Sequence, residues 1–471
     1  MTVGPPNLIF LLVDQLRMQS CGYGGDVRAR TPNIDSLARG GVSFVNAVSS
    51  DPVCGPYRAS LMTGKYASTT GMVINEMRAN PRHDCIGHVL TRSGYDTAYI
   101  GKWHLWSNQT EGENLPENGF VPAGPARLGF DGYWAAYNFN FDYFHPNYFL
   151  TDGERIVGDR YETEFTTKLA IDWLSSRTGK NPFAMFLSFG PPHDPWEWNN
   201  VPERLAKEFD PAGFPLPETY EDGSAEYWEP SMDRQWWLST VKPNLPKWQA
   251  VYAAMAASID ECCGTLLGRL RQDGLIENTL LVFTSDHGEM FGAHGRMAKN
   301  IFYEEAVRIP FLVYWPGRVP GGLADYTCLG TPDIMPTLLG ALGLDVPDEV
   351  EGTDFSGHLF GKAAPDGEHA FLQGMGHTWM WLDGFEWRGV RSRQFTYAVR
   401  RIDREEFFFD NLKDPLQKIN LAKHPEHARE KERIKNIMVS KMADLNDEFM
   451  ECSWYGKNWT ENRRVLRGAK G

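Results

Sequence analysis

The sequence predicts an α/β fold with a large, mainly parallel central sheet flanked by helices on both faces. A small C-terminal subdomain with an antiparallel sheet and a helix is expected to follow it. Short apolar runs alternate with helical patterns along most of the chain, and these runs are nearly continuous, as in strands buried on both faces. From about residue 360 the runs become shorter and closer together, which favours antiparallel pairing.

Six apolar runs rich in β-branched or aromatic residues predict the strands of the central sheet. They are Leu8–Val13, Val42–Val48, Thr97–Ile100, Phe183–Phe189, Leu280–Thr284 and Phe311–Trp315. Helical patterns occupy the segments between them: Asn33–Arg39, His83–Arg92, Glu162–Ser175, Trp248–Arg271 and Asp333–Leu342. This alternation is typical of parallel strands joined by crossover helices.

The C-terminal part predicts four short strands at Phe371–Gln373, Trp387–Val390, Thr396–Arg400 and Glu406–Asp410, then a charged amphipathic helix over roughly residues 427–449. We therefore expect one domain over residues 1–360 and a subdomain over residues 361–471. Two long interruptions of the first domain, residues 106–160 and 195–245, carry few regular patterns and many aromatic residues. Such rings either line a substrate pocket or form a satellite core or subunit contact.

Composition narrows the class of protein. The net charge of −14 argues against nucleic acid as a partner, because nucleic acid needs a concentrated basic surface. The first apolar run, Leu8–Val13, is too short for a secretory signal, and no segment is expected to span a membrane. Seven cysteines, an odd number without the spacing of a small disulfide-rich domain, favour a reduced, cytoplasmic setting.

Ionisable residues follow the predicted strands at the point where each strand ends. They are Asp14, Cys54 in the loop after Val48, Lys102 and His104, His193, and Asp286 with His287. Ligands of open α/β sheets bind at the carboxyl ends of the strands. The sequence therefore predicts one composite active site at this edge.

Three of these residues are candidate metal ligands. Asp14, Asp286 and His287 offer two hard oxygens and an imidazole from two strand ends, and Gln15 could add an amide oxygen. This set suits Ca²⁺, with Mn²⁺ or Mg²⁺ as alternatives because imidazole is unusual for calcium. Asp and His at strand ends also cap turns, so these residues become specific evidence for a metal site only together with Cys54.

The stretch around Cys54 reads Cys54-Gly-Pro56-Tyr-Arg58, with Gly64 further on. Pro56 suits the first turn of a helix and Gly64 its end. Cys54 then lies at a helix N-terminus, which favours negative charge, and Arg58 lies one turn away on the same face. For a lone cysteine, a buried residue at the start of an ordinary helix would be the simpler reading.

This run resembles the Cys-x-Pro-x-Arg motif of the type I sulfatases of the alkaline phosphatase superfamily. Gly101-Lys102-Trp-His104, His193, Asp286-His287-Gly288 and Gly295-Arg-Met-Ala-Lys299 extend the resemblance from Asn7 to about Leu421. It implies that a formylglycine-generating maturation enzyme converts Cys54 to formylglycine, whose hydrate is the nucleophile in the cleavage of a sulfate ester.

The resemblance also implies a role for each matching residue. Asp14, Asp286 and His287 would bind the metal together with the modified Cys54. Arg58 and Lys102 would hold the formylglycine hydrate, and His104 would assist release of sulfate. Lys299 would bind a sulfate oxygen, and His193 would protonate the leaving group or bind sulfate. Histidines suit such proton transfers because their ordinary pKa lies near neutrality.

Two departures from the commonest sulfatase pattern leave alternatives open. Gln15 replaces a second Asp, and His287 replaces an Asn, a combination that is also similar to phosphonate monoester hydrolases. We expect a sulfatase acting on an organic, preferably carbohydrate, sulfate, with a phosphonate or phosphodiester hydrolase second. A catalytically silent binding protein is third, because Cys54, Pro56 and Arg58 are intact. The aromatic C-terminal tail could form a homo-oligomer contact.

Overall fold

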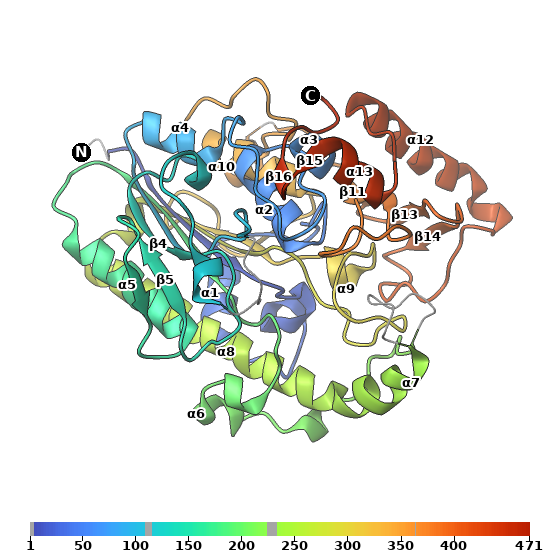
Figure 1. Ribbon diagram of the computed structural model, residues 1–471, viewed down its shortest axis with the longest axis horizontal. Coiled ribbons are helices and arrows are strands. Elements are labelled where there is room, and N and C mark those ends of the chain that lie inside the picture. Colours follow the sequence, from blue (N-terminus) through green and yellow to red (C-terminus); the bar gives the residue numbers. More distant parts are fainter. Residues whose placement is uncertain (1–3, 109–114, 224–232, 363) are drawn as a thin grey trace.

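The computed structural model describes residues 4–108, 115–223, 233–362 and 364–471 (Figure 1). Its main sheet has the strand order β10-β2-β9-β8-β1-β7-β3-β4-β5-β6. The strands are β1 (Asn7–Val13), β2 (Val42–Phe44), β3 (Asp96–Lys102), β4 (Tyr133–Tyr137), β5 (Asn147–Leu150), β6 (Arg155–Val157), β7 (Phe183–Phe189), β8 (Thr279–Ser285), β9 (Phe311–Tyr314) and β10 (Leu323–Asp325). The five neighbours β8, β1, β7, β3 and β4 run parallel, which confirms the predicted fold class.

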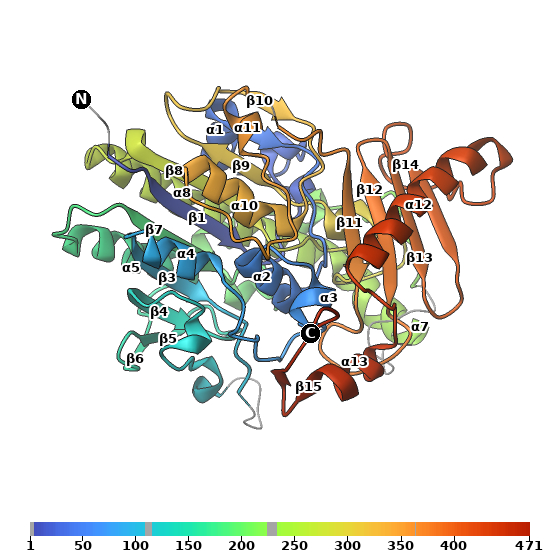
Figure 2. The ribbon, with the colours of Figure 1, turned by 90° about the horizontal axis from the view of Figure 1, so that it is seen from above.

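Both faces of the main sheet are covered by helices (Figure 2). Along β1, Leu8, Phe10 and Leu12 belong to one hydrophobic core, and the alternate residues Ile9, Leu11 and Val13 belong to another. Side chains of a strand point to opposite faces in turn, so β1 is buried on both sides. The first core holds α2 (Cys54–Thr63), α4 (Ile86–Arg92) and α10 (Thr331–Leu342); the second holds α1 (Pro32–Gly40), α5 (Glu162–Ser176) and α8 (Lys242–Gln272).

The helix α2 begins at Cys54 and ends before Gly64. Gly64 has a left-handed backbone, φ 65°, and its N–H donates to the carbonyl of Ser60, as glycine does at a helix end. All ten residues of α2 are buried, and α2 packs against α10 and the short α3 (Ala67–Thr70). The helix predicted from Pro56 and Gly64 therefore forms.

The C-terminal part forms the predicted antiparallel sheet and helix. Strands β11 (His369–Gly374), β12 (Trp387–Ser392), β13 (Phe395–Arg400) and β14 (Glu406–Asp410) pair in sequence order, and α12 (Ala428–Asp444) packs on β12 and β13. The chain then returns to the main domain: Cys452, Tyr455 and Trp459 of α13 (Cys452–Trp459) join its first core, followed by the hairpin β15 (Thr460–Glu461) and β16 (Arg464–Val465). The division at residue 360 stays a prediction.

Three sequence expectations need correction. The predicted strand Val42–Val48 ends at Phe44, and Val48 makes only an isolated bridge to Arg308. The stretch 106–160, expected to hold few regular elements, contributes β4, β5 and β6. The stretch 195–245 holds short helices, α6 (Glu203–Ala206) and α7 (Arg234–Trp236), and the start of α8. Two further short helices are α9 (Glu304–Val307) and α11 (Ser356–Leu359).

The aromatic residues of the two interruptions divide between core and active site. Tyr137 and Tyr148 pack edge to face in the second core, with centroids 5.3 Å apart. Phe139 instead lies 5.2 Å from the ring of His104, and Phe141 5.7 Å from His193. The core alternative is therefore confirmed for Tyr137 and Tyr148, whereas a substrate pocket lined by Phe139 and Phe141 stays a prediction. Tyr227 and Trp228 lie outside the described residues.

One helical stretch, Arg234–Gln272, is long and apolar enough to cross a membrane by length and composition. The expectation that no segment meets those criteria is therefore wrong. Of its most apolar window, 78% is buried inside the fold, and α8 packs against α1, α5 and α6. Core packing accounts for its apolar composition.

Candidate active site

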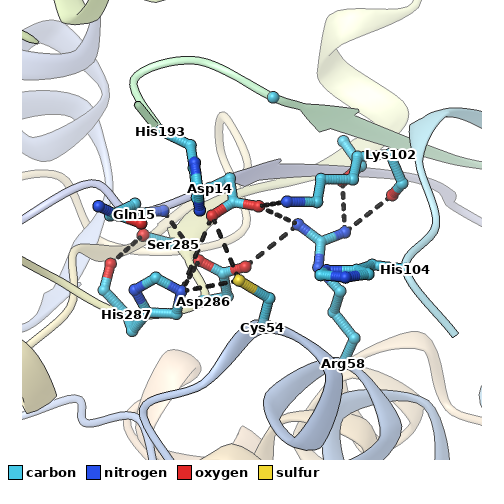
Figure 3. A network of polar contacts seen from close by, with 12 residues as sticks. Asp14, Gln15, Cys54, Arg58, Lys102, His104, His193, Ser285, Asp286 and His287 are labelled. Atoms are coloured by element: carbon cyan, nitrogen blue, oxygen red, sulfur yellow. Dashed lines mark hydrogen bonds and ion pairs between the residues drawn. The ribbon is translucent and has the colours of Figure 1, made fainter. Parts of the chain in front are cut away.

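Four candidate ligands converge at the carboxyl edge of the main sheet. One ligand atom each from Asp14, Cys54, Asp286 and His287 lies within 4.8 Å of all the others, and all four residues are buried (Figure 3). Asp14 follows β1, Asp286 and His287 follow β8, and Cys54 is the first residue of α2. Residues far apart in the chain thus form one cage.

The imidazole of His287 is oriented as a metal ligand. Its Nδ1 lies 3.0 Å from the carbonyl oxygen of Gly288, which can only accept, so Nδ1 carries the hydrogen. The lone pair of Nε2 then faces the cage, 3.2 Å from Cys54 Sγ and 3.5 Å from Asp286 Oδ1. Burial lowers the pKa of His287, which favours the neutral ring that binds cations.

Arg58 forms the positive wall of the cage. Its Nη2 lies 3.1 Å from Asp286 Oδ2 and 3.4 Å from Asp14 Oδ2. Its Nη1 donates to the carbonyl of Lys102 and to Ser188 Oγ, each at 2.8 Å. A guanidinium held by four acceptors has one orientation, so Arg58 fixes both carboxylates relative to α2.

Lys102 adds a second cation, because its ammonium contacts Asp14 Oδ2. Burial by itself would raise the pKa of Asp14, but the charges of Lys102 and Arg58 outweigh it and hold that pKa well below its usual value. Asp14 therefore stays ionised inside the protein. With the Oδ2 atoms facing Arg58 and Lys102, the Oδ1 atoms of Asp14 and Asp286 and Nε2 of His287 remain on the cysteine side, a donor set that fits a divalent cation.

Lys299 joins two other predicted residues, Gln15 and His193. Its Nζ lies 2.6 Å from Gln15 Oε1 and 2.9 Å from His193 Nε2. The Gln15 Nε2 group donates to Glu289 at 2.8 Å, so the amide is held at both ends. The amide oxygen of Gln15 is thus engaged by Lys299, and its role as a metal ligand stays a prediction.

The Lys299–His193 pair keeps its proton on the lysine. Burial and the neighbouring Lys299 push the pKa of His193 well below its usual value. Burial opposes the charge of Lys299, but Cys54, Asp14 and Asp194 raise its pKa above the ordinary value. His193 is therefore neutral, with Nδ1 directed to Asp194 at 3.1 Å and Nε2 accepting from Lys299.

His104 follows β3 and is held by Glu76. Its Nε2 lies 3.2 Å from Glu76 Oε1, while Ser107 Oγ donates to Glu76 Oε2 at 2.9 Å. Burial would raise the pKa of Glu76, but the hydrogen bonds from His104 and Ser107 lower it to about 2. Glu76 is thus a fixed carboxylate that orients the ring. The backbone of His104 is left-handed, φ 57°, a conformation that the surrounding bonds maintain.

Three supporting residues were missed from the sequence: Glu76, Ser188 and Glu289. Ser188 is the penultimate residue of β7, so the strand-end rule that found His193 could have found it. Glu289 lies three residues after Asp286 and could have been recognised as part of the same turn. Glu76 lies in an irregular segment between helices, where no pattern marks it.

The fold and the site together define a hydrolase of the alkaline phosphatase superfamily. The sulfatase family model matches residues 6–344, and the model of the C-terminal part of N-sulphoglucosamine sulphohydrolase matches residues 292–446. The chain therefore belongs to the sulfatase family and is an enzyme of that family, as its resemblance implied.

Relatives cover nearly the whole chain. An ulvan-active sulfatase of Formosa agariphila is 33% identical over 96% of this chain and 84% of its own length. An N-acetylglucosamine-6-O-sulfatase of Bacteroides thetaiotaomicron is 27% identical over 94% of this chain and 87% of its own. The crystal structure of the phosphonate monoester hydrolase of Agrobacterium radiobacter shares the fold, with a TM-score of 0.69, 22% identity and coverage of 97% and 98%.

Proposed function

We propose that the protein hydrolyses a carbohydrate sulfate monoester to an alcohol and sulfate, with a formylglycine hydrate formed from Cys54 as the nucleophile. The observation that carries the proposal is the cage of Asp14, Cys54, Asp286 and His287, closed by Arg58. Relatives named for a glucosamine sulfate and for ulvan support a saccharide as the alcohol.

A divalent cation would be held by Asp14, Asp286, His287 and the modified Cys54, with Ca²⁺ first and Mn²⁺ or Mg²⁺ as alternatives. When bound, it would neutralise negative charge that develops on sulfate and nucleophile. The fit rests on the orientation of His287, whose hydrogen-bearing Nδ1 is turned to Gly288 and whose Nε2 faces the carboxylates.

In the first step, one hydroxyl of the hydrate releases its proton to water and attacks sulfur, and the bond between sulfur and the ester oxygen breaks. Arg58 and Lys102, held against Asp14 and Asp286, favour the ionised hydroxyl. The ester oxygen leaves as an alcohol after taking a proton through the Lys299–His193 pair, where the resting proton is on Lys299.

In the second step, the sulfated residue collapses. The remaining hydroxyl gives its proton to His104, which Glu76 holds in place, and the carbon–oxygen bond to sulfate breaks. Sulfate leaves, an aldehyde forms, and water restores the hydrate. A serine could not take this route, because it carries no second hydroxyl on the same carbon.

Phosphonate monoester hydrolysis is the second candidate. Gln15 takes the place of an additional carboxylate and is engaged with Lys299, which leaves fewer negative charges around the substrate anion. The two activities are separated by comparing kcat/KM for 4-nitrophenyl sulfate and a phenyl phosphonate monoester. A higher value for the phosphonate would reverse the order.

To test the proposal, the protein is expressed together with a formylglycine-generating enzyme. Peptide mass spectrometry then identifies the residue at position 54, and an assay measures the sulfate released from the ester. We expect formylglycine at 54, and a loss of about three orders of magnitude or more in kcat/KM for Cys54→Ala. Cys54→Ser should be inactive or accumulate sulfated protein. Cys263→Ala, at a buried cysteine outside the cage, is the matched control and should keep its activity. An unmodified thiol without turnover of any ester would indicate a silent binding protein.

A further inference from the structure

A hollow of about 430 Å³ lies outside the cage and plays no part in the chemistry above. We call it the basic pocket and define it by Arg78, Arg82, Trp106, Pro125 and Arg464, which line it. Three parts of the chain distant in the sequence line it: residues 78–82, Trp106 together with Pro122, Ala123, Pro125 and Ala126, and residues 464–466 at the C-terminal hairpin.

Backbone pairing holds these segments together. Arg78 forms an antiparallel bridge with Trp106 on one side and a parallel bridge with Arg464 on the other. The N–H of Arg78 donates to the carbonyl of Arg463 at 2.7 Å, and the N–H of Val465 donates to the carbonyl of Arg78 at 3.0 Å. The walls are thus fixed before any ligand arrives, which lowers the entropy cost of binding.

The pocket gathers arginines in a chain of net charge −14. Among the residues that the structure describes, no carboxylate lines it, and neither Arg82 nor Arg464 forms an ion pair. The guanidinium of Arg78 lies over Trp106, 5.1 Å from the ring centroid, and donates to the carbonyl of Ser107. Burial, then Arg464 and Arg463, lower the pKa of Arg78, as expected where like charges gather.

The basic pocket adjoins the active site through the chain. Trp106 lies two residues after His104, and Arg78 two residues after Glu76, the pair that the second chemical step uses. Two residues of extended chain span at most about 7 Å. Ser107 also ties the two regions together, because its hydroxyl donates to Glu76 and accepts from Arg463.

We propose that the basic pocket binds a sulfate or carboxylate group on a sugar residue of the substrate chain other than the one being desulfated. This inference rests on the proposed carbohydrate substrate. Planar guanidinium groups can donate two hydrogen bonds to a pair of oxygens of such anions, and the proline, alanine and tryptophan surfaces suit the apolar face of a sugar ring. The enzyme would therefore prefer polyanionic oligosaccharides over monosaccharide sulfates.

Binding is measured separately from turnover by titrating Cys54→Ala protein with a heparin hexasaccharide, an oligogalacturonate hexamer and uncharged maltohexaose. The double variant Arg82→Ala/Arg464→Ala should bind the better anionic hexamer about tenfold more weakly, with a shallower salt dependence. The matched control Arg39→Ala/Arg429→Ala, at two exposed arginines elsewhere, should bind like the parent. Thermal unfolding checks that both variants fold.

The same substitutions in active protein should leave kcat/KM for 4-nitrophenyl sulfate unchanged, because this small ester does not reach the pocket. Equal anionic-hexamer affinity of parent and Arg82→Ala/Arg464→Ala protein would overturn the inference, as would absence of binding to both hexamers. Tighter binding of a 12-nucleotide DNA strand than of either saccharide would also overturn it, in favour of nucleic acid. None of these binding results depends on sulfate release. Failure of the proposed function, which sulfate release tests, can therefore be distinguished from failure of the proposed binding site.

Discussion

Replacing Arg58 by methionine tests the cage in the absence of substrate. Arg58, Asp14 and Asp286 have no exposed side-chain surface, and Arg58 is the guanidinium that contacts both carboxylates. Lys102 still faces Asp14 in Arg58→Met, but Asp286 loses its cation. Removing one partner of a buried ion pair costs about 3–5 kcal/mol, because the remaining charge is left without compensation.

The expected shift in melting temperature follows from the size of the chain. An unfolding entropy of about 2.1 cal/mol/K per residue gives about 1 kcal/mol/K for 471 residues, so the loss corresponds to about 3–5 °C. The assay is thermal unfolding at pH 7.5 in chelator and in Ca²⁺, Mn²⁺ or Mg²⁺. A bound cation stabilises the native state by about 2.7 kcal/mol when its free concentration is one hundred times its Kd. It also supplies the positive charge that the carboxylate of Asp286 loses in Arg58→Met.

Arg388→Met is the matched control. Arg388 pairs with Asp447 in a second buried ion pair, at 2.5 and 2.9 Å, away from the four-residue cage. Its melting temperature should fall by a similar amount, but equally in chelator and in metal. Two results would refute this explanation. One is that Arg58→Met has the parent's melting temperature in chelator. The other is that no divalent cation reduces the drop in melting temperature of Arg58→Met more than it reduces that of Arg388→Met.

Three further substitutions test Glu76, Gly101 and Glu162. Glu76→Gln should lower kcat for 4-nitrophenyl sulfate about tenfold or more through its bond to His104, and an unchanged kcat would contradict that role. Gly101→Ala should lower both stability and kcat, because a Cβ there would lie 1.9 Å from the carbonyl oxygen of Ser188 and would displace Lys102; wild-type melting and activity would show that β3 adapts freely. Burial raises the pKa of Glu162 from 4.5 to about 7, so the native state keeps a proton that the unfolded chain loses, and stability should fall by about 3 kcal/mol as pH rises from 4.5 to 7. The free energy of unfolding of Glu162→Gln, measured with urea, should depend less on pH across this range than that of the parent. The same pH dependence in both proteins would exclude Glu162 as its source.

The sequence predicts the centre of the fold better than its margins. The strands from Leu8, Phe183 and Leu280 appear within one residue of their expected bounds, because a strand buried on both faces must be apolar throughout. The same pattern failed at Val42–Val48, because the chain turns after Phe44, and the buried residues Ala47 and Val48 lie beyond that turn outside any strand. It also missed β4 to β6, because their aromatic residues suggested a pocket more strongly than a sheet edge.

The candidate site shows a similar division. The site residues at strand ends could be predicted, because the parallel topology places all of them at the carboxyl edge of the main sheet. This placement does not depend on their individual contacts. The engagement of Gln15 by Lys299 depends on the fold of the loop after residue 288. Glu76 is placed by its contacts with His104 and Ser107 rather than by a regular element. No local pattern specifies such contacts.

The burial of Cys54 would limit when the proposed oxidation of its thiol can take place. The imidazole of His287, part of the wall that covers the thiol, is encoded 233 positions later. At about 5–20 residues per second, a ribosome needs about 10–50 s to add that stretch. An oxidising enzyme that acted on the nascent chain would have about this interval before His287 is added, because after folding the sulfur has no exposed surface.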